Sequence, residues 1–196
     1  MSDCESSTSV DSFGCIGNTI KVADGGYVDL LNPDPASIHL STIASALSKM
    51  CRFGGQCPRF YSVAEHCVHA MRLAIEKGWR DCEILSAILL HDAAEAYVGD
   101  MVKPLKLLIP EFSKIEERVE RAIAMRFGID FVAWKDVVRT FDMAMLKAEK
   151  LAMWPDDKHN WAGFSDVDTF RVDFMFLTHR LAESWFLEAA ESVGLK

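Results

Sequence analysis

The stretch SAILLHDAAEAYVGD, residues 86–100, places ionisable side chains inside an apolar helical segment. After four apolar residues it brings His91, Asp92 and Glu95 into the same run. Because successive residues of a helix are rotated by about 100°, these three side chains are expected to share one face. A buried carboxylate without a partner is strongly destabilising. The chain must therefore fold so that a cation or a hydrogen-bond network reaches this face.

Two more ionisable residues lie in apolar helical surroundings, namely His66 and Asp142. Taken alone, such a His is more often a hydrogen-bonded core residue, and such an Asp more often a helix cap or a solvent-facing acid. Together with the pair at 91–92 they make two imidazoles and two carboxylates. This set suits a first-row divalent transition ion better than Ca²⁺ or a thiolate-bound structural zinc. The predicted metal ligands are His66, His91, Asp92 and Asp142.

Most of the remaining sequence has the apolar periodicity of helices. Residues 19–22 and 27–30 flank Asp24-Gly25-Gly26 and predict a short β-hairpin. The predicted helices include residues 38 to the stop at Gly54-Gly55, 62–78, 81–99, 113–128, about 137–152 before Pro155, and about 173–192. We therefore predict an all-α fold with a short N-terminal β-hairpin.

Local motifs suggest where three of these helices begin. Ser62 with Glu65, and Ser113 with Glu116, have the spacing of capping boxes. Asp81 is a candidate N-cap for the helix that carries the 86–100 stretch.

The composition and the net charge limit the classes to which the protein can belong. The formal net charge of -8 argues against a generic nucleic-acid surface, so an anionic ligand must be bound by a few local cations. No apolar segment reaches the roughly 20 residues of a membrane span. Residues 1–17 are predicted to be a flexible acidic, Ser-rich tail without the pattern of a signal peptide, followed by one domain, residues 18–196.

The six cysteines lack the paired C-x-x-C spacing of a zinc site and the density of a disulfide scaffold. Reduced thiols in a cytoplasmic protein are the simpler interpretation. Cys67 and Cys82 are predicted to be small core residues.

The order His66, His91-Asp92, Asp142 resembles that of the HD-domain metal-dependent phosphohydrolases. The segments C-R-F-x-G at 51–55, Y-S-V-A-E-H at 61–66 and H-D-A-x-E-A-Y-x-x-D-x-x-x-P-L-K at 91–106 are similar to a small bacterial and phage branch. That branch contains 5′-deoxynucleotidases and deoxynucleoside triphosphate triphosphohydrolases, and the similarity runs from about Gly26 to the end of the fifth predicted helix. It implies an HD-domain helical bundle, a nucleotide substrate and a homo-oligomer in the cytoplasm of a bacterial or phage-infected cell. The metal would be Zn, Co, Mn, Fe or Ni, whereas Mg fits less well as the sole metal.

The resemblance also implies roles for other residues. Glu95 matches the glutamate that handles the proton of the attacking water or leaving oxygen, and Asp100 an aspartate near the sugar or leaving group. Arg52 matches an arginine that contacts the substrate phosphate, and Phe53 could stack on a base. Each residue also has a structural alternative. Glu95 could orient a metal ligand, Asp100 could be a solvated loop residue, and Phe53 could be a core aromatic. Relatives often carry a His where this chain has Gln56.

Two further cations, Lys106 and Arg139, are candidates for binding a polyphosphate tail, although each alone is more often a surface charge. They favour a triphosphohydrolase that converts a purine deoxynucleoside triphosphate, such as dATP, to deoxynucleoside and tripolyphosphate. The alternatives are a 5′-deoxynucleotidase acting on monophosphates, a non-catalytic metal-dependent nucleotide sensor, and a helical interaction module without a metal.

Overall fold

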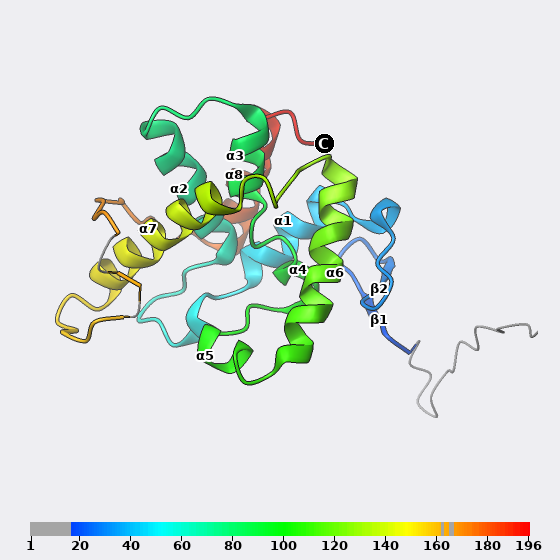
Figure 1. Ribbon diagram of the computed structural model, residues 1–196, viewed down its shortest axis with the longest axis horizontal. Helices are drawn as coiled ribbons and strands as arrows, with labels where there is room; N and C mark the ends of the chain where they lie inside the picture. Colours follow the sequence, from blue (N-terminus) through cyan, green and yellow to red (C-terminus); the bar gives the residue numbers. More distant parts are fainter. Residues whose placement is uncertain (1–16, 162, 165–166) are drawn as a thin grey trace, which may run out of the picture.

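The computed structural model describes residues 17–161, 163–164 and 167–196, in which helices dominate and one β-hairpin precedes them (Figure 1). Except for Gly17, the predicted tail lies outside these residues. The α-helices are α1 (Leu40–Lys49), α2 (Val63–Glu76), α3 (Cys82–Leu89), α4 (Glu95–Val98), α5 (Lys103–Lys106), α6 (Pro110–Phe127), α7 (Lys135–Met153) and α8 (His179–Ser192). The short 3-10 turns are η1 (Pro35–Ser37) and η2 (Phe53–Gly55). The predicted all-α fold with a hairpin is confirmed, and none of the described helices has the length and apolar character needed to cross a membrane.

The hairpin forms where the turn residues predicted it. Strands β1 (Thr19–Lys21) and β2 (Tyr27–Asp29) pair antiparallel, with Ile20 opposite Val28. The Gly26 N–H donates to Asp24 Oδ1 over 2.8 Å, and Gly25 has a φ of 91° that favours glycine. Val28 is buried and attaches the hairpin to the helical core.

Helix α2 is the central element, because it packs against α1, α3, α7 and α8. It begins as predicted, with Ser62 Oγ accepting from the Glu65 N–H over 3.1 Å. Nearly all of its residues are buried, including both His66 and Glu65 with no exposed surface. A helix buried on every side places its polar residues where they need partners from other elements.

The predicted continuous helix over 81–99 is wrong. Asp81 caps α3 as expected and Gly99 ends α4, but the chain leaves the helical path between Leu89 and Glu95. His91 Nδ1 donates to the Ile88 carbonyl over 2.8 Å, and backbone bonds in this turn join residues three apart. His91 and Asp92 therefore lie in a turn, not on a helix face.

Helix α6 begins earlier than predicted. Pro110 occupies its first position, where the missing N–H removes no helical bond, so Ser113 lies inside the helix. Glu116 forms an ion pair with Lys106 instead of a capping box. The predicted end is confirmed, since Gly128 adopts a left-handed φ of 67°.

The first helix ends before the predicted Gly54-Gly55 stop. Helix α1 ends at Lys49, and Cys51 then forms an isolated antiparallel β-bridge with Ser62. The Val63 N–H donates to the Met50 carbonyl over 3.0 Å. This pairing with the start of α2 draws the backbone out of the helix, and the two glycines lie in the turn that follows.

Helix α8 begins at His179 and not near residue 173, because a buried carboxylate binds the backbone N–H groups of the preceding segment and holds it out of the helix. The backbone N–H groups of Met175, Phe176 and Leu177 donate to the Glu65 carboxylate over 2.8–3.0 Å. Glu65 therefore does not complete the predicted capping box with Ser62. Its side chain joins the centre of the core to the C-terminal segment instead.

We expect Glu65→Gln to lower the free energy of unfolding by about 2–3 kcal/mol, since a neutral amide replaces a buried charged acceptor and turns an N–H toward other donors. Urea unfolding measures this change. The matched control is Glu76→Gln on the exposed end of α2, for which a change within about 0.5 kcal/mol is expected. Equal stability of the two variants would contradict the role given to Glu65.

Candidate metal site

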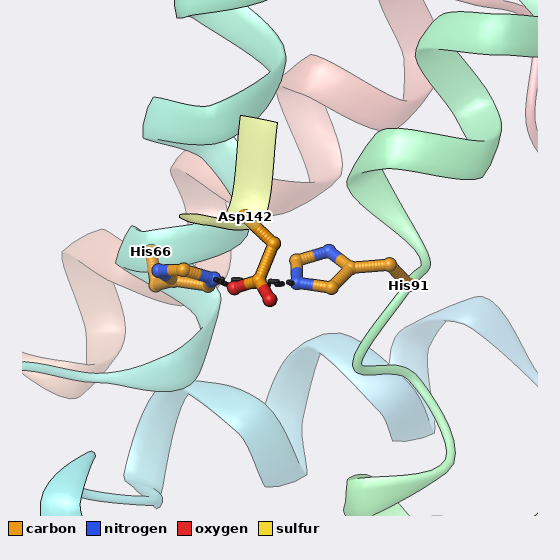
Figure 2. Close-up of side chains that lie close together, drawn as sticks. All are labelled: His66, His91 and Asp142. Atoms are coloured by element: carbon orange, nitrogen blue, oxygen red, sulfur yellow. Dashed lines mark hydrogen bonds and ion pairs between the residues drawn. The ribbon is translucent and has the colours of Figure 1, made fainter. Parts of the chain in front are cut away.

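Four side-chain atoms from three segments of the chain meet beside α2. The Nε2 atoms of His66 and His91 are 3.3 Å apart, and His66 Nε2 lies 3.4 Å from Asp142 Oδ1. Asp92 Oδ2 lies 3.2 Å from His91 Nε2. Figure 2 shows the Asp142 carboxylate between the two imidazole rings. The structure thus brings together the four residues predicted as metal ligands.

The elements behind these side chains explain their convergence. His66 projects from the buried α2, Asp142 from α7, which packs on α2, and His91 from the turn after α3. The His66 side chain has no exposed surface, whereas that of Asp142 is 38 % exposed. The site is therefore closed on the core side and accessible near α7. A cavity of about 210 Å³ adjoins it, lined by His91, Glu120, Phe131, Lys135, Val138, Arg139 and Asp142.

Hydrogen bonds fix the orientation of both imidazoles. His66 Nδ1 lies 2.6 Å from Glu149 Oε1, and His91 Nδ1 lies 2.8 Å from the Ile88 carbonyl. A carbonyl only accepts, so His91 Nδ1 must carry its hydrogen, and the carboxylate favours the same tautomer of His66. In their neutral forms both rings then direct Nε2 lone pairs at the same point as two carboxylates. His66, His91 and Asp142 bring their ligand atoms close enough together to hold a divalent ion, and Asp92 Oδ2 lies within 3.7 Å of both Nε2 atoms.

The pKa values of the clustered side chains are shifted by the charges of their neighbours. Burial alone would lower the pKa of His91, but the Asp92 charge raises it well above its usual range. Burial alone would raise the pKa of Asp142, but hydrogen bonds from His66 and His91 hold it well below its usual range. The cluster therefore attracts positive charge, either as protons on the imidazoles or as a metal ion.

Glu149 is a residue of the candidate site that the sequence did not single out. It is fully buried, and its two oxygens contact His66 Nδ1 and, over 3.2 Å, the Nη2 of Arg52. Burial alone would raise the pKa of Glu149, but the charges of Arg52 and His66 lower it. Glu149 lies seven residues after Asp142 on α7, two helical turns along the same face, and this spacing could have identified it.

Arg52 lies at the site, and Phe53 lies beside it. Arg52 Nη1 is 3.4 Å from Asp92 Oδ2, and the Nε atom is buried without a partner among the described residues. The Phe53 ring packs edge-on against Trp154, with centroids 5.1 Å apart, and near Trp161 at 6.2 Å. Phe53 is thus part of an aromatic cluster and does not stand alone.

Glu95 and Asp100 both have partly buried carboxyl groups near the candidate metal site. One oxygen of each is buried without a hydrogen-bond partner among the described residues. Burial and the charges of Asp92 and Asp100 raise the pKa of Glu95 to about 10. Burial also raises the pKa of Asp100, and the charge of Asp92 adds to this effect.

The two predicted polyphosphate cations differ in their placement. Arg139 lines the 210 Å³ cavity beside Asp142, and Lys135, which the sequence did not single out, lines it too. Lys106 is ion-paired with Glu116 on α6. The His69 Nε2 atom lies 3.5 Å from Glu65 Oε1, and Gln56 is exposed.

Comparison with known proteins places the chain among bacterial relatives. It is 36% identical over 149 residues to the uncharacterized protein YfdR of Escherichia coli K12, an alignment that covers 74% of this chain and 79% of YfdR. The chain belongs to the YfdR family. A second relative, the uncharacterized protein RCAP_rcc00048 of Rhodobacter capsulatus, is 31% identical over 161 residues, which cover 78% of this chain and 77% of that protein. No family model matches the chain.

In this member of the YfdR family, Glu149→Gln is expected to weaken binding of a divalent transition ion by about 10–100-fold, because the His66 ring loses the charged group that orients it. Isothermal titration of the metal-stripped protein measures the affinity. Asp136→Asn is the matched control, an exposed acid in the first turn of α7, and should bind as wild type does. Equal affinities for Glu149→Gln and wild type would contradict the positioning role.

Proposed function

We propose that the protein is a metal-dependent phosphohydrolase that cleaves the bond between the 5′ oxygen and the α-phosphorus of a 2′-deoxynucleotide. The convergence of two imidazoles and two carboxylates around one point carries this proposal. The donor set fits a divalent transition ion because both Nδ1 atoms are already bonded, which leaves both Nε2 atoms for the ion. When bound, such an ion would polarise the phosphorus and stabilise the charge that develops on the phosphoryl oxygens.

The residues around the cluster supply the other parts of this chemistry. Arg52 brings a permanent positive charge next to Asp92, where it can contact a phosphoryl oxygen. Glu95 has a partly buried carboxyl whose pKa is raised to about 10, which favours its protonated form. A carboxyl in this state can donate its proton to the leaving 5′ oxygen. A protein that only binds nucleotides does not need such a proton-donating carboxyl.

The cations near the cavity determine how long a phosphate chain the site can bind. Arg139 and Lys135 line it next to Asp142 and could bind phosphates beyond the α position. We therefore favour a triphosphate substrate and the release of tripolyphosphate. The ion pair between Lys106 and Glu116 removes one expected polyphosphate contact and favours the alternative, a 5′-deoxynucleotidase acting on monophosphates.

A hydrolysis screen tests the proposal. The metal-stripped protein is supplied with Mn²⁺, Co²⁺, Zn²⁺ or Mg²⁺ and incubated with each deoxynucleoside mono- and triphosphate, and chromatography follows the release of nucleoside. We expect nucleoside without di- or monophosphate intermediates, and a loss of turnover of about 10²–10⁴-fold in Glu95→Gln, since that variant lacks the proton donor.

Controls separate the competing functions. Glu117→Gln, an exposed acid on α6, should leave turnover unchanged, and Glu95→Gln should still bind metal. Arg139→Ala should lower triphosphate turnover more than monophosphate turnover, whereas Lys106→Ala should change neither. Turnover of monophosphates alone would establish the nucleotidase. Metal binding without turnover of any substrate would refute hydrolysis and leave a nucleotide sensor.

A further inference from the structure

Two cysteine thiols meet across the loop that carries Arg52 and Phe53. The Sγ atoms of Cys51 and Cys57 are 3.5 Å apart, and both residues are partly buried. The other described cysteines are far less suited to pairing. Cys67 is buried as predicted, whereas Cys82 is exposed at the start of α3, so its predicted core position is wrong. Cys4 and Cys15 lie outside the described residues.

The backbone of this loop is shaped to bring the two sulfurs together. Phe53, Gly54 and Gly55 have successive φ values of 59°, 60° and 76°, a tight turn in the left-handed region. Such a conformation is unfavourable for the non-glycine Phe53 and must be held by its surroundings. On one side Cys51 is fixed by its β-bridge to Ser62. On the other, the Cys57 thiol donates to the Arg59 carbonyl over 3.0 Å.

We propose that Cys51 and Cys57 form a reversible disulfide that closes the loop carrying Arg52 and Phe53. A disulfide bond is about 2.05 Å long, so the sulfurs need only approach by roughly 1.5 Å. The oxidant is a small-molecule disulfide. The Cys51 thiolate attacks one of its sulfurs and releases one thiol, and the Cys57 thiolate then attacks the Cys51 sulfur and releases the second. Two protein thiols are oxidised and one external disulfide is reduced.

A disulfide across this loop would affect the candidate metal site by displacing Arg52. Its guanidinium lies between Asp92 and Glu149, and its backbone N–H donates to the Tyr61 carbonyl over 2.9 Å. A shift of the flanking cysteines displaces the loop from which Arg52 reaches these carboxylates. The effect of the disulfide on turnover rests on the proposed function, whereas the formation of the disulfide does not.

The two exchange steps differ in their dependence on pH. Burial and the neighbouring Cys51 thiol raise the pKa of Cys57 to about 11, so little of it is thiolate at neutral pH. The second step therefore speeds up as the pH rises toward that value. A mixed disulfide on Cys51 should accumulate first and then decay to the closed loop.

Peptide mapping of the full chain tests the inference. The protein is incubated with oxidised glutathione, free thiols are alkylated, and trypsin then cuts after Lys49, Arg52 and Arg59. Because Arg52 separates the two cysteines, a disulfide leaves peptides 50–52 and 53–59 linked, and a reductant separates them. We expect this linked pair as the main disulfide product, at a yield unchanged in Cys82→Ser.

Cys57→Ser should stop at the mixed disulfide on Cys51, which gains the mass of one glutathione moiety. If wild type yields only mixed disulfides, or pairs Cys51 and Cys57 no more often than other cysteines, the inference is overturned, and this result needs no variant to fold. Loss of turnover in the oxidised protein, restored by a reductant, would support the effect on Arg52. Absence of turnover in the reduced protein would instead overturn the proposed function and leave the disulfide standing.

Discussion

The buried carboxylate of Glu149 is the interaction on which the site depends. It contacts His66 on α2 and Arg52 in the loop before α2, and it comes from α7, so one charge joins three segments. None of these groups could be buried alone without a large loss of stability. Their mutual compensation allows His66, which has no exposed surface, to present Nε2 to Asp142, which lies two helical turns before Glu149 on the same face of α7.

Helix α2 uses adjacent residues for two different tasks. Glu65 bonds the backbone before α8, and His66 turns toward α7 and the turn after α3. The C-terminal segment and the candidate metal site are therefore attached to the same buried turn of helix. This coupling explains why α2, and not the more exposed α6, lies at the centre of the fold.

The sequence was sufficient where a local pattern decided the structure. Ionisable residues in apolar surroundings identified His66, His91, Asp92 and Asp142, and turn residues identified the hairpin. The sequence was insufficient where a distant partner decided. Ala93 and Ala94 are good helix formers, yet hydrogen bonds in the turn after α3 override that preference. The apolar pattern before α8 resembles a helix, but the carboxylate of Glu65, more than a hundred residues earlier, binds its backbone N–H groups and keeps it non-helical. The sequence did not single out Glu149, because its partners His66 and Arg52 lie in other elements.

The four converging side chains are expected to bind one divalent ion. Anomalous diffraction from crystals grown with Co²⁺ tests this expectation most directly. We expect one strong peak per chain, about 2.0–2.3 Å from the Nε2 atoms of His66 and His91 and from carboxylate oxygens of Asp92 and Asp142. A peak at another place, or no peak at this cluster with saturating Co²⁺, would contradict it.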